Sequence, residues 1–391
     1  MASRGGACRC GSGTATGAVP ARAAAPAAHP RSRTTPAATA RTGRGRPGRL
    51  ASAYARHVQP SDAFPDTAAW YAAFADQAAG SSPTYEAWSR AIAADTEVLA
   101  LVETLPGERR QPNLVLAAAR AAGAPVGDWA GLRAWLVGAW PAVADVARRR
   151  TTQTNEAGRC AVLLPALSRV PGPLALIEVG ASAGLCLYPD RYAYAYTDDD
   201  GGTTRLGDPA DVVLPCRVTG GSTAAPAVRR PEVVWRAGID LAPLDVRRPD
   251  DLAWLEALVW PEHDVRRERL AAAARLVAQD PPLLVAGDLL DRLGEVLAEV
   301  PRGATPVVLH SAVLAYLPAD RRAAFVGAVT AARATHGVRW LSNEGHAVLP
   351  DVAARLPVGT EVGNRFVAAL DGAPVGLAGQ HGETYEPLPR R

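Results

Sequence analysis

Lysine is absent from this 391-residue chain, so all 42 of its basic residues are arginine. This absence excludes sites that depend on a lysine side chain, such as the Walker A loop, the kinase strand lysine and the lysine Schiff base. Methionine occurs once, while alanine, arginine, glycine and proline abound, which we interpret as GC-rich coding bias. The arginine content therefore does not by itself indicate a nucleic-acid partner.

Acidic residues are missing from residues 1–61, which contain ten arginines. Residues 62–391 carry 32 arginines against 39 acidic residues, a net charge of −7, so we expect no nucleic-acid partner. Residues 1–61 also hold almost no large apolar side chain, and their Ala/Pro/Arg-rich composition predicts a disordered tail. Either an organelle transit peptide or translation from an upstream start in a GC-rich gene would explain this tail.

Cysteine is scarce, and its spacing does not suggest a disulfide framework or a zinc site. Cys8 and Cys10 lie in the predicted tail, and Cys160, Cys186 and Cys216 lie among apolar or strand-like residues. Buried free thiols are typical of a reducing compartment, so we expect a cytoplasmic protein. No apolar run approaches the roughly 18–20 residues of a membrane span, and no His/Cys cluster indicates a metal, so we expect neither a membrane nor a metal partner.

Residues 62–170 have a helical pattern and predict an all-helical subdomain. Ser82 followed by Pro83 is a typical helix start, and residues 113–122 and 129–149 continue the helical period. We expect the aromatic side chains of this region to form its core rather than to bind a ligand. They are Trp70, Tyr71, Phe74, Trp88, Trp135 and Trp140.

Residues 171–350 alternate strand-like and helix-like runs, which predicts an α/β domain with a Rossmann-like parallel sheet covered by helices on both faces. A β insertion is expected at about 188–229, and residues 351–391 follow as a C-terminal extension. The predicted strands span 174–179, 233–239, 282–287, 305–310 and 337–342. The predicted helices include 250–260, 266–279 and 320–335.

The first predicted strand ends in Glu178 and continues into a glycine-rich turn with Gly180, Ser182 and Gly184. A buried strand, a loop and a helix start are expected here, with backbone N–H groups directed at a ligand. The letters also spell G-x-S-x-G, the nucleophile elbow of a serine hydrolase with Ser182 as nucleophile. Its acid and base candidates are Asp288, His310, His346 and His381. The dinucleotide fingerprint is a poorer match, since it needs glycine at positions 182 and 185. The remaining pattern, E-x-G-x-S-x-G, is close to the first motif of class I methyltransferases.

Acidic residues occur at the ends of several predicted strands, where ligands of parallel sheets bind. Glu178, Asp240, Asp288 and Glu344 are the four. In a methyltransferase-like site, Asp240 would accept hydrogen bonds from the ribose hydroxyls and Asp288 one from the adenine amino group. Alternatively, each acid caps the following helix.

Several motifs together resemble the uncharacterised actinobacterial family called domain of unknown function 2332, over about residues 65–350. The similar segments are 152–160, 178–185, 190–192, 236–245, 254–255, 259–261 and 310–311. The resemblance implies a methyltransferase-like Rossmann fold without an assigned substrate. We expect asparagine where this chain has Cys186, which removes a polar group beside the glycine turn.

A run of polar residues precedes the glycine motif and is expected to line a pocket above Gly180. Glu156 and Arg159 lie one helical turn apart and could pair with each other. Alternatively, Asn155 and Arg159 hold a carboxylate or phosphate of the substrate. Together with Gln153, Tyr192 and Arg236, these residues form the predicted substrate site. His310, at a strand end, is the candidate general base.

The sequence thus favours an S-adenosylmethionine-dependent methyltransferase-like protein acting on a small molecule. The cofactor would bind through Glu178, Gly180, Ser182, Gly184, Asp240 and Asp288. A serine hydrolase using Ser182 and a non-catalytic ligand-binding protein are the alternatives. The sequence leaves the substrate and the oligomeric state open.

Overall fold

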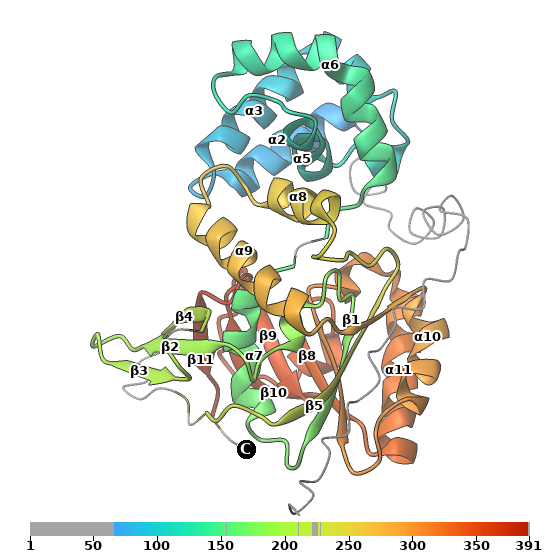
Figure 1. Ribbon diagram of the computed structural model, residues 1–391. Coiled ribbons are helices and arrows are strands. Elements are labelled where there is room, and N and C mark those ends of the chain that lie inside the picture. The colour runs from blue at the N-terminus through green and yellow to red at the C-terminus, as the bar shows by residue number, and fades with distance from the viewer. Residues whose placement is uncertain (1–65, 154, 210, 221–225, 227, 390–391) are drawn as a thin grey trace, which may run out of the picture. The chain divides into compact units, whose positions relative to one another are not determined.

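The computed structural model describes residues 66–389 except 154, 210, 221–225 and 227 (Figure 1). The predicted tail at residues 1–61, with Cys8 and Cys10, lies outside this part of the chain. Cys160, Cys186 and Cys216 are buried free thiols.

The chain between residues 67 and 149 is helical. Its elements are α2 (Thr67–Ala78), α3 (Pro83–Ala94), α4 (Thr96–Val102), the 3₁₀ turn η2 (Gly107–Arg109), α5 (Pro112–Ala121) and α6 (Trp129–Arg149). Ser82 caps α3 as its sequence predicts, by accepting from the Tyr85 N–H. Of the predicted core aromatics, Tyr71, Phe74, Trp88 and Trp140 are buried. Trp70 and Trp135 are half-buried.

Five strands form the parallel part of a central sheet. They are β1 (Leu174–Val179), β5 (Val233–Asp240), β6 (Leu283–Ala286), β7 (Thr305–Ser311) and β8 (Arg339–Gly345), and they lie in the order β6-β5-β1-β7-β8. All four neighbouring pairs are parallel. Each strand corresponds to one that the sequence predicts, because continuous apolar runs bounded by turn residues are typical of buried parallel strands.

The expected parallel strands are part of a larger, mixed sheet, because six further strands bring it to eleven in the described part of the chain. They are β2 (Ala193–Thr197), β3 (Thr203–Leu206), β4 (Val213–Val218), β9 (Phe366–Leu370), β10 (Ala373–Ala378) and β11 (Thr384–Pro387). Strand β9 is antiparallel to β8 and to β10. Asp371 and Gly372 connect β9 to β10 with φ of 55° and 80°. Two residues of positive φ make a tight hairpin turn, which joins strands only in antiparallel order.

Helices cover both faces of the sheet (Figure 1). The helices α10 (Leu289–Ala298) and α11 (Ala319–His336) pack on the face that carries Ile177 and Val179 of β1. The opposite face carries Leu174 and Leu176 and packs with the buried α7 (Cys160–Leu167) and with α9 (Asp264–Gln279). The alternation along β1 follows from the two-residue period of a strand. A polar side chain on a strand therefore faces either α10 and α11 or α7 and α9, depending on which of the two alternating sets of strand positions it occupies.

Three short elements connect the strands near the carboxyl ends of the parallel sheet. Helix α8 (Pro249–Leu258) contacts α5, and Arg150 pairs with Asp251 of α8 at 2.7 Å, so the chain that follows α6 is tied to the segment after β5. The turn η5 (Leu314–Tyr316) follows β7, and α12 (Pro350–Ala353) follows β8.

None of the helices in the described ranges has the length and apolar character needed to cross a membrane.

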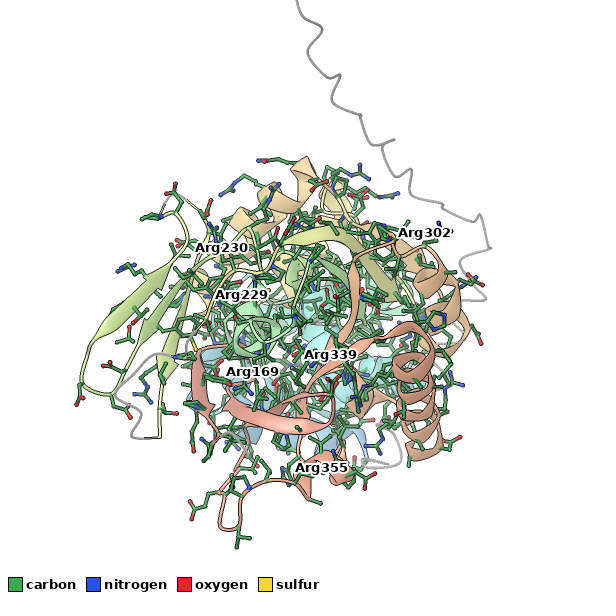
Figure 2. All side chains as sticks on the ribbon, turned by 90° about the horizontal axis from the view of Figure 1, so that it is seen from below. Arg169, Arg229, Arg230, Arg302, Arg339 and Arg355 are labelled. Carbon is green, nitrogen blue, oxygen red and sulfur yellow. The ribbon has the colours of Figure 1, made fainter. Side chains whose placement is uncertain are left out.

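Arginines gather at the amino ends of the parallel strands. Figure 2 labels Arg169, which precedes β1, Arg229 and Arg230, which precede β5, and Arg302, which precedes β7. Arg339 begins β8 and pairs with Asp371 at 2.7 Å. Since parallel strands share one direction, this edge is opposite to the one where their carboxyl ends meet. Ligands of open parallel sheets bind at the carboxyl edge.

Candidate functional site

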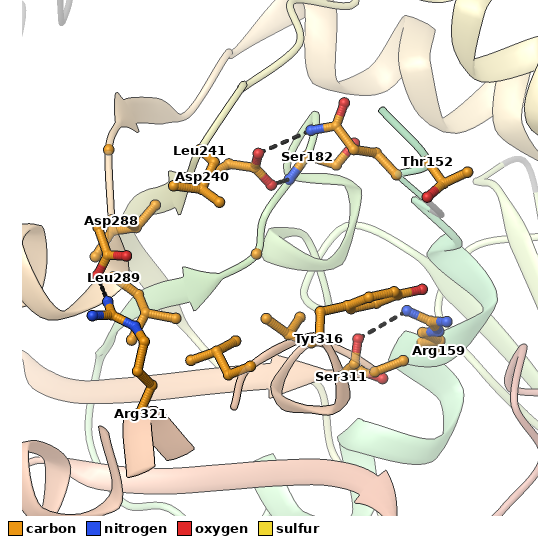
Figure 3. A pocket seen from close by; sticks show the side chains of 17 residues that line it. Thr152, Arg159, Ser182, Asp240, Leu241, Asp288, Leu289, Ser311, Tyr316 and Arg321 are labelled. Atoms are coloured by element: carbon orange, nitrogen blue, oxygen red, sulfur yellow. Dashed lines mark hydrogen bonds and ion pairs between the residues drawn. The ribbon is translucent and has the colours of Figure 1, made fainter. Parts of the chain in front are cut away.

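A cavity of about 140 Å³ lies at the carboxyl ends of four parallel strands (Figure 3). One residue that lines it follows each strand: Gly180 after β1, Leu241 after β5, Asp288 after β6 and Ala312 after β7. This is the position at which open parallel sheets bind ligands. Pockets for drug-sized ligands hold roughly 300–1,000 Å³, so a nucleoside-sized ligand would extend beyond the enclosed volume.

The glycine turn after β1 has the left-handed backbone that its sequence indicates. Gly180 and Gly184 have φ of 71° and 75°, and Ser182, between them, has φ of 50°. A Cβ on Gly180 would lie 2.4 Å from Cγ2 of Val313, and one on Gly184 would lie 2.9 Å from Cγ of Pro282. Both glycines are thus required by close packing within the protein, whereas the sequence suggested close approach of a ligand. Gly180 nevertheless lines the cavity.

The helix expected directly after this turn is absent. The turn continues into a single 3₁₀ turn, η4 (Leu185–Leu187), and then into the insertion that holds β2, β3 and β4. The N–H of Leu185 donates to Oδ1 of Asn155 at 3.0 Å, and the N–H of Gly184 donates to the Ala181 carbonyl at 2.7 Å. Because the chain has used these donors internally, the turn does not present the row of free N–H groups that binds phosphate at a helix start.

Asp240 ends β5 and faces the glycine turn. Its Oδ2 accepts from the Ser182 N–H at 2.8 Å, and its Oδ1 accepts from Nε2 of Gln153 at 2.9 Å and from the Ala242 N–H at 2.8 Å. Burial raises the pKa of Asp240, and these three hydrogen bonds act against that rise. Asp240, Gln153 and Ser182 all line the cavity, as the sequence analysis expected for a ligand site. The Ser182 hydroxyl is buried and has no hydrogen-bond partner among the described residues.

Asp288 has the capping role that the sequence offered as one alternative, and it also lies at the cavity. It caps α10 by accepting from the Leu290 N–H at 2.9 Å, and it also lines the cavity. Its Oδ1 pairs with Nη2 of Arg321 at 2.6 Å. Arg321 lies in the first turn of α11 and lines the cavity too. The carboxylate is therefore neutralised by an arginine that the sequence analysis did not single out.

Some of the polar residues before α7 stabilise the fold, and others line the cavity. Asn155 holds the glycine turn from both sides, because its Nδ2 donates to the Ala181 carbonyl and its Oδ1 accepts from Leu185. Glu156 is 5% exposed and pairs with Arg266 at 2.7 Å and Arg269 at 2.8 Å. Of the two alternatives that the sequence left open, the pairing of Glu156 with Arg159 is therefore not found, since α9 supplies the two arginines that pair with Glu156. Arg159 lines the cavity instead.

His310 lies outside the cavity. It is fully buried on the sheet face that α11 covers, with its ring 5.5 Å from that of Phe325. Nε1 of Trp340 donates to its Nε2 at 3.0 Å, so the proton belongs on Nδ1, which donates to Glu344 Oε1 at 2.7 Å. The same Glu344 oxygen accepts from the Val313 and Leu314 N–H groups. His310 thus helps to hold the loop after β7, and both of its ring nitrogens are occupied.

Six other predicted residues are also outside the cavity lining: Gly184, Asn155 and Glu156, described above, and Tyr192, Arg236 and Glu178. Tyr192 is fully buried and donates to the Leu185 carbonyl at 2.8 Å. Arg236 pairs with Asp190 at 2.7 Å and lies over the Tyr188 ring, 4.7 Å from its centroid. Glu178 points to the α7 side of the sheet, where its Oε2 is buried with no hydrogen-bond partner in the described part of the chain, and burial raises its pKa well above the usual value. Of the last three side chains, Tyr192 contacts the residue that directly follows the glycine turn.

Several residues that line the cavity were not predicted from the sequence. Ser311, Ala312 and Tyr316, at the end of β7 and in the loop after it, line the cavity, as does Thr152. Ala312 has φ of 57°, an uncommon conformation for a residue with a side chain. Of these lining residues, only Ser311 could have been predicted from the sequence, because it lies at the end of a predicted strand. Among the described residues, His, Cys, Asp and Glu form no group able to hold a metal.

The chain belongs to the family described as "Uncharacterized protein conserved in bacteria (DUF2332)", whose model matches residues 68–386. This agrees with the family that the sequence motifs resemble. No curated protein and no solved structure matches the chain.

Proposed function

We propose that the chain is a Rossmann-like, S-adenosylmethionine-binding protein of the methyltransferase type that acts on a small molecule. One observation carries the proposal: Asp240 ends the strand next to β1, accepts a hydrogen bond from the glycine turn and lines the cavity with it. The strand order β6-β5-β1-β7-β8, numbered by appearance of the parallel strands, is 3-2-1-4-5. This is the order of nucleotide-binding sheets, in which an acid after the second strand binds the ribose.

The side chains around the cavity fit such a cofactor in part. Asp240 would accept from ribose hydroxyls, but three hydrogen bonds already occupy its oxygens, so a hydroxyl would take the place of Gln153. Leu241 and Leu289 offer apolar contacts for an adenine ring near Asp288. The enclosed volume of about 140 Å³ requires part of the ligand to lie at the open side.

The bound cofactor would supply an electrophilic methyl group, and the protein would mainly position the acceptor and exclude water. A general base is needed only for an acceptor that holds its proton at neutral pH. Tyr316 and Ser311 are the hydroxyl groups at the β7 side of the cavity, whereas His310 does not reach it. We therefore assign no base.

Calorimetry with S-adenosylmethionine and S-adenosylhomocysteine on the full chain tests the proposal. We expect micromolar binding that falls at least tenfold in Asp240→Asn. The control is Asp199→Asn, an exposed aspartate between β2 and β3, which should bind like the parent. Absence of heat with both ligands, or equal binding by Asp240→Asn, would refute the cofactor site. Binding without methyl transfer to any acceptor would favour the non-catalytic alternative.

A serine hydrolase is the second candidate, and the strained Ser182 favours it. A nucleophile elbow holds its serine at a sharp turn after a strand, and Ser182 has φ of 50° and an unpartnered hydroxyl. Against it, the elbow requires a following helix, which η4 does not provide, and no histidine is among the residues lining the cavity in the described part of the chain.

A further inference from the structure

Arg159 differs from the other arginines near the cavity in how its charge is paired. Its side chain is in the interior, with the residue 7% exposed, and it lines the cavity beside Ser311 and Tyr316 (Figure 3). In the part of the chain that the structure describes, no carboxylate oxygen forms an ion pair with it within 4.0 Å. By contrast, Arg266 and Arg269 pair with Glu156, and Arg321 pairs with Asp288.

A buried acid that interacts with Arg159 does not offset this charge. Glu178 interacts with Arg159, yet its burial raises its pKa well above the usual range, which favours the uncharged carboxyl group. A buried cation without a counterion is costly, and proteins generally pair such charges. An anionic group of a ligand would provide the missing partner.

The guanidinium is also oriented for binding. Its Nε donates to the Gln380 carbonyl and its Nη1 to the Ser311 carbonyl, both at 3.0 Å. Backbone acceptors therefore fix the plane of the group, while three of its five N–H donors remain for a ligand in the described surroundings. In Figure 3 the ring of Tyr316 extends alongside the guanidinium, so the two side chains form one end of the cavity.

We propose that this end of the cavity, formed by Arg159 and Tyr316, is a carboxylate-binding subsite. One guanidinium matches one carboxylate with two parallel hydrogen bonds. A phosphate fits less well, because the second cation of the cavity, Arg321, is neutralised by Asp288 and the glycine turn has used its N–H donors internally. The inference extends the proposed function, but the subsite does not depend on the cofactor. The carboxylate comes either from the cofactor's amino-acid part or from a separate small acid.

Two probe pairs distinguish these sources by calorimetry on the full chain, each pair matching an acid with its uncharged amide. The first pair is S-adenosylhomocysteine and its carboxamide, and the second is a set of straight-chain C4–C8 carboxylates and their amides. We expect at least a tenfold preference for the acid in one pair. The preference should disappear in Arg159→Met, fall in Arg159→Lys and persist in Arg302→Met, an exposed control at the opposite edge of the sheet.

The outcomes separate this subsite from the cofactor proposal. A preference in the first pair assigns the subsite to the cofactor's carboxylate, and one in the second pair alone assigns it to a separate acid, even if S-adenosylhomocysteine does not bind. Equal binding of acids and amides, or an acid preference that survives in Arg159→Met, would overturn the subsite whether or not the cofactor binds. Circular dichroism checks folding, and Arg159→Gln replaces Arg159→Met if the latter does not fold.

Discussion

Glu156 allows a quantitative test of how the structure near the cavity is held. The carboxylate is 5% exposed, and its Oε1 accepts from Arg269 at 2.8 Å and from the Gly158 N–H at 2.9 Å. Its Oε2 accepts from Arg266 at 2.7 Å. Burial alone would raise the pKa of Glu156, but the two arginines and the hydrogen bonds outweigh it and lower the pKa from 4.5 to about 2. The ionised carboxylate is thus more stable in the folded chain than in the unfolded one.

The pKa difference converts into stability. At about 1.4 kcal/mol per pH unit, the ionised form of Glu156 contributes about 3 kcal/mol to the free energy of unfolding at neutral pH. Because the folded pKa is the lower one, the contribution is complete above pH 4.5 and disappears as the pH falls towards 2. At pH 3, about 1 kcal/mol remains.

The variant Glu156→Gln should therefore lose about 3 kcal/mol at pH 7 but only about 1 kcal/mol at pH 3. Urea unfolding at a series of pH values and constant ionic strength, followed by circular dichroism, measures both. Glu299→Gln, at an exposed position after α10, is the control and should show no penalty that depends on pH. A penalty for Glu156→Gln that stays constant from pH 7 to pH 3 would refute the role assigned to its charge.

Three other experiments test separate features. Gly180→Ala places a Cβ 2.4 Å from Val313 at φ of 71°, so it should cost at least about 2 kcal/mol, of which Val313→Ala in the same chain restores the steric part; no loss in urea unfolding would contradict the close packing. Trp340→Phe removes the donor to His310 Nε2 and should cost about 1–3 kcal/mol, whereas a cost below about 0.5 kcal/mol would show that the bond does not stabilise the fold. A fluorophosphonate probe should leave the chain unlabelled, because no histidine lines the described cavity; labelling that disappears in Ser182→Ala would instead support the hydrolase.

The parallel part of the sheet could be predicted because its strands are buried on both faces. Runs such as Leu174–Val179 and Thr305–Ser311 are apolar throughout, and turn residues bound them. The strands after residue 351, which are β9, β10 and β11, were not predicted. Phe366–Leu370 and Ala373–Ala378 contain alanine, glycine and proline, which favour strands poorly, and their pairing depends on the turn between them.

The candidate site was predicted where a strand end alone determines position. Asp240, Asp288, Gly180 and Ser182 line the cavity because the carboxyl ends of parallel strands meet at one edge. The role of Arg321 could not be inferred in this way. It comes from the first turn of α11, and only the packing of that helix beside α10 and β8 brings it to Asp288.

For His310, the sequence allows one further inference, which concerns the face of the sheet on which its side chain lies. Side chains of a strand alternate between the two faces of a sheet, so His310 shares a face with Val308 and Ser311 shares the other with Leu309. Val308 packs in the cluster of α10 and α11, while Leu309 packs in the cluster of α7. Arg159, just before α7, can therefore reach Ser311 but not His310. Parity along β7, combined with the position of Arg159 before α7, is enough to exclude His310 from the cavity and to select Ser311.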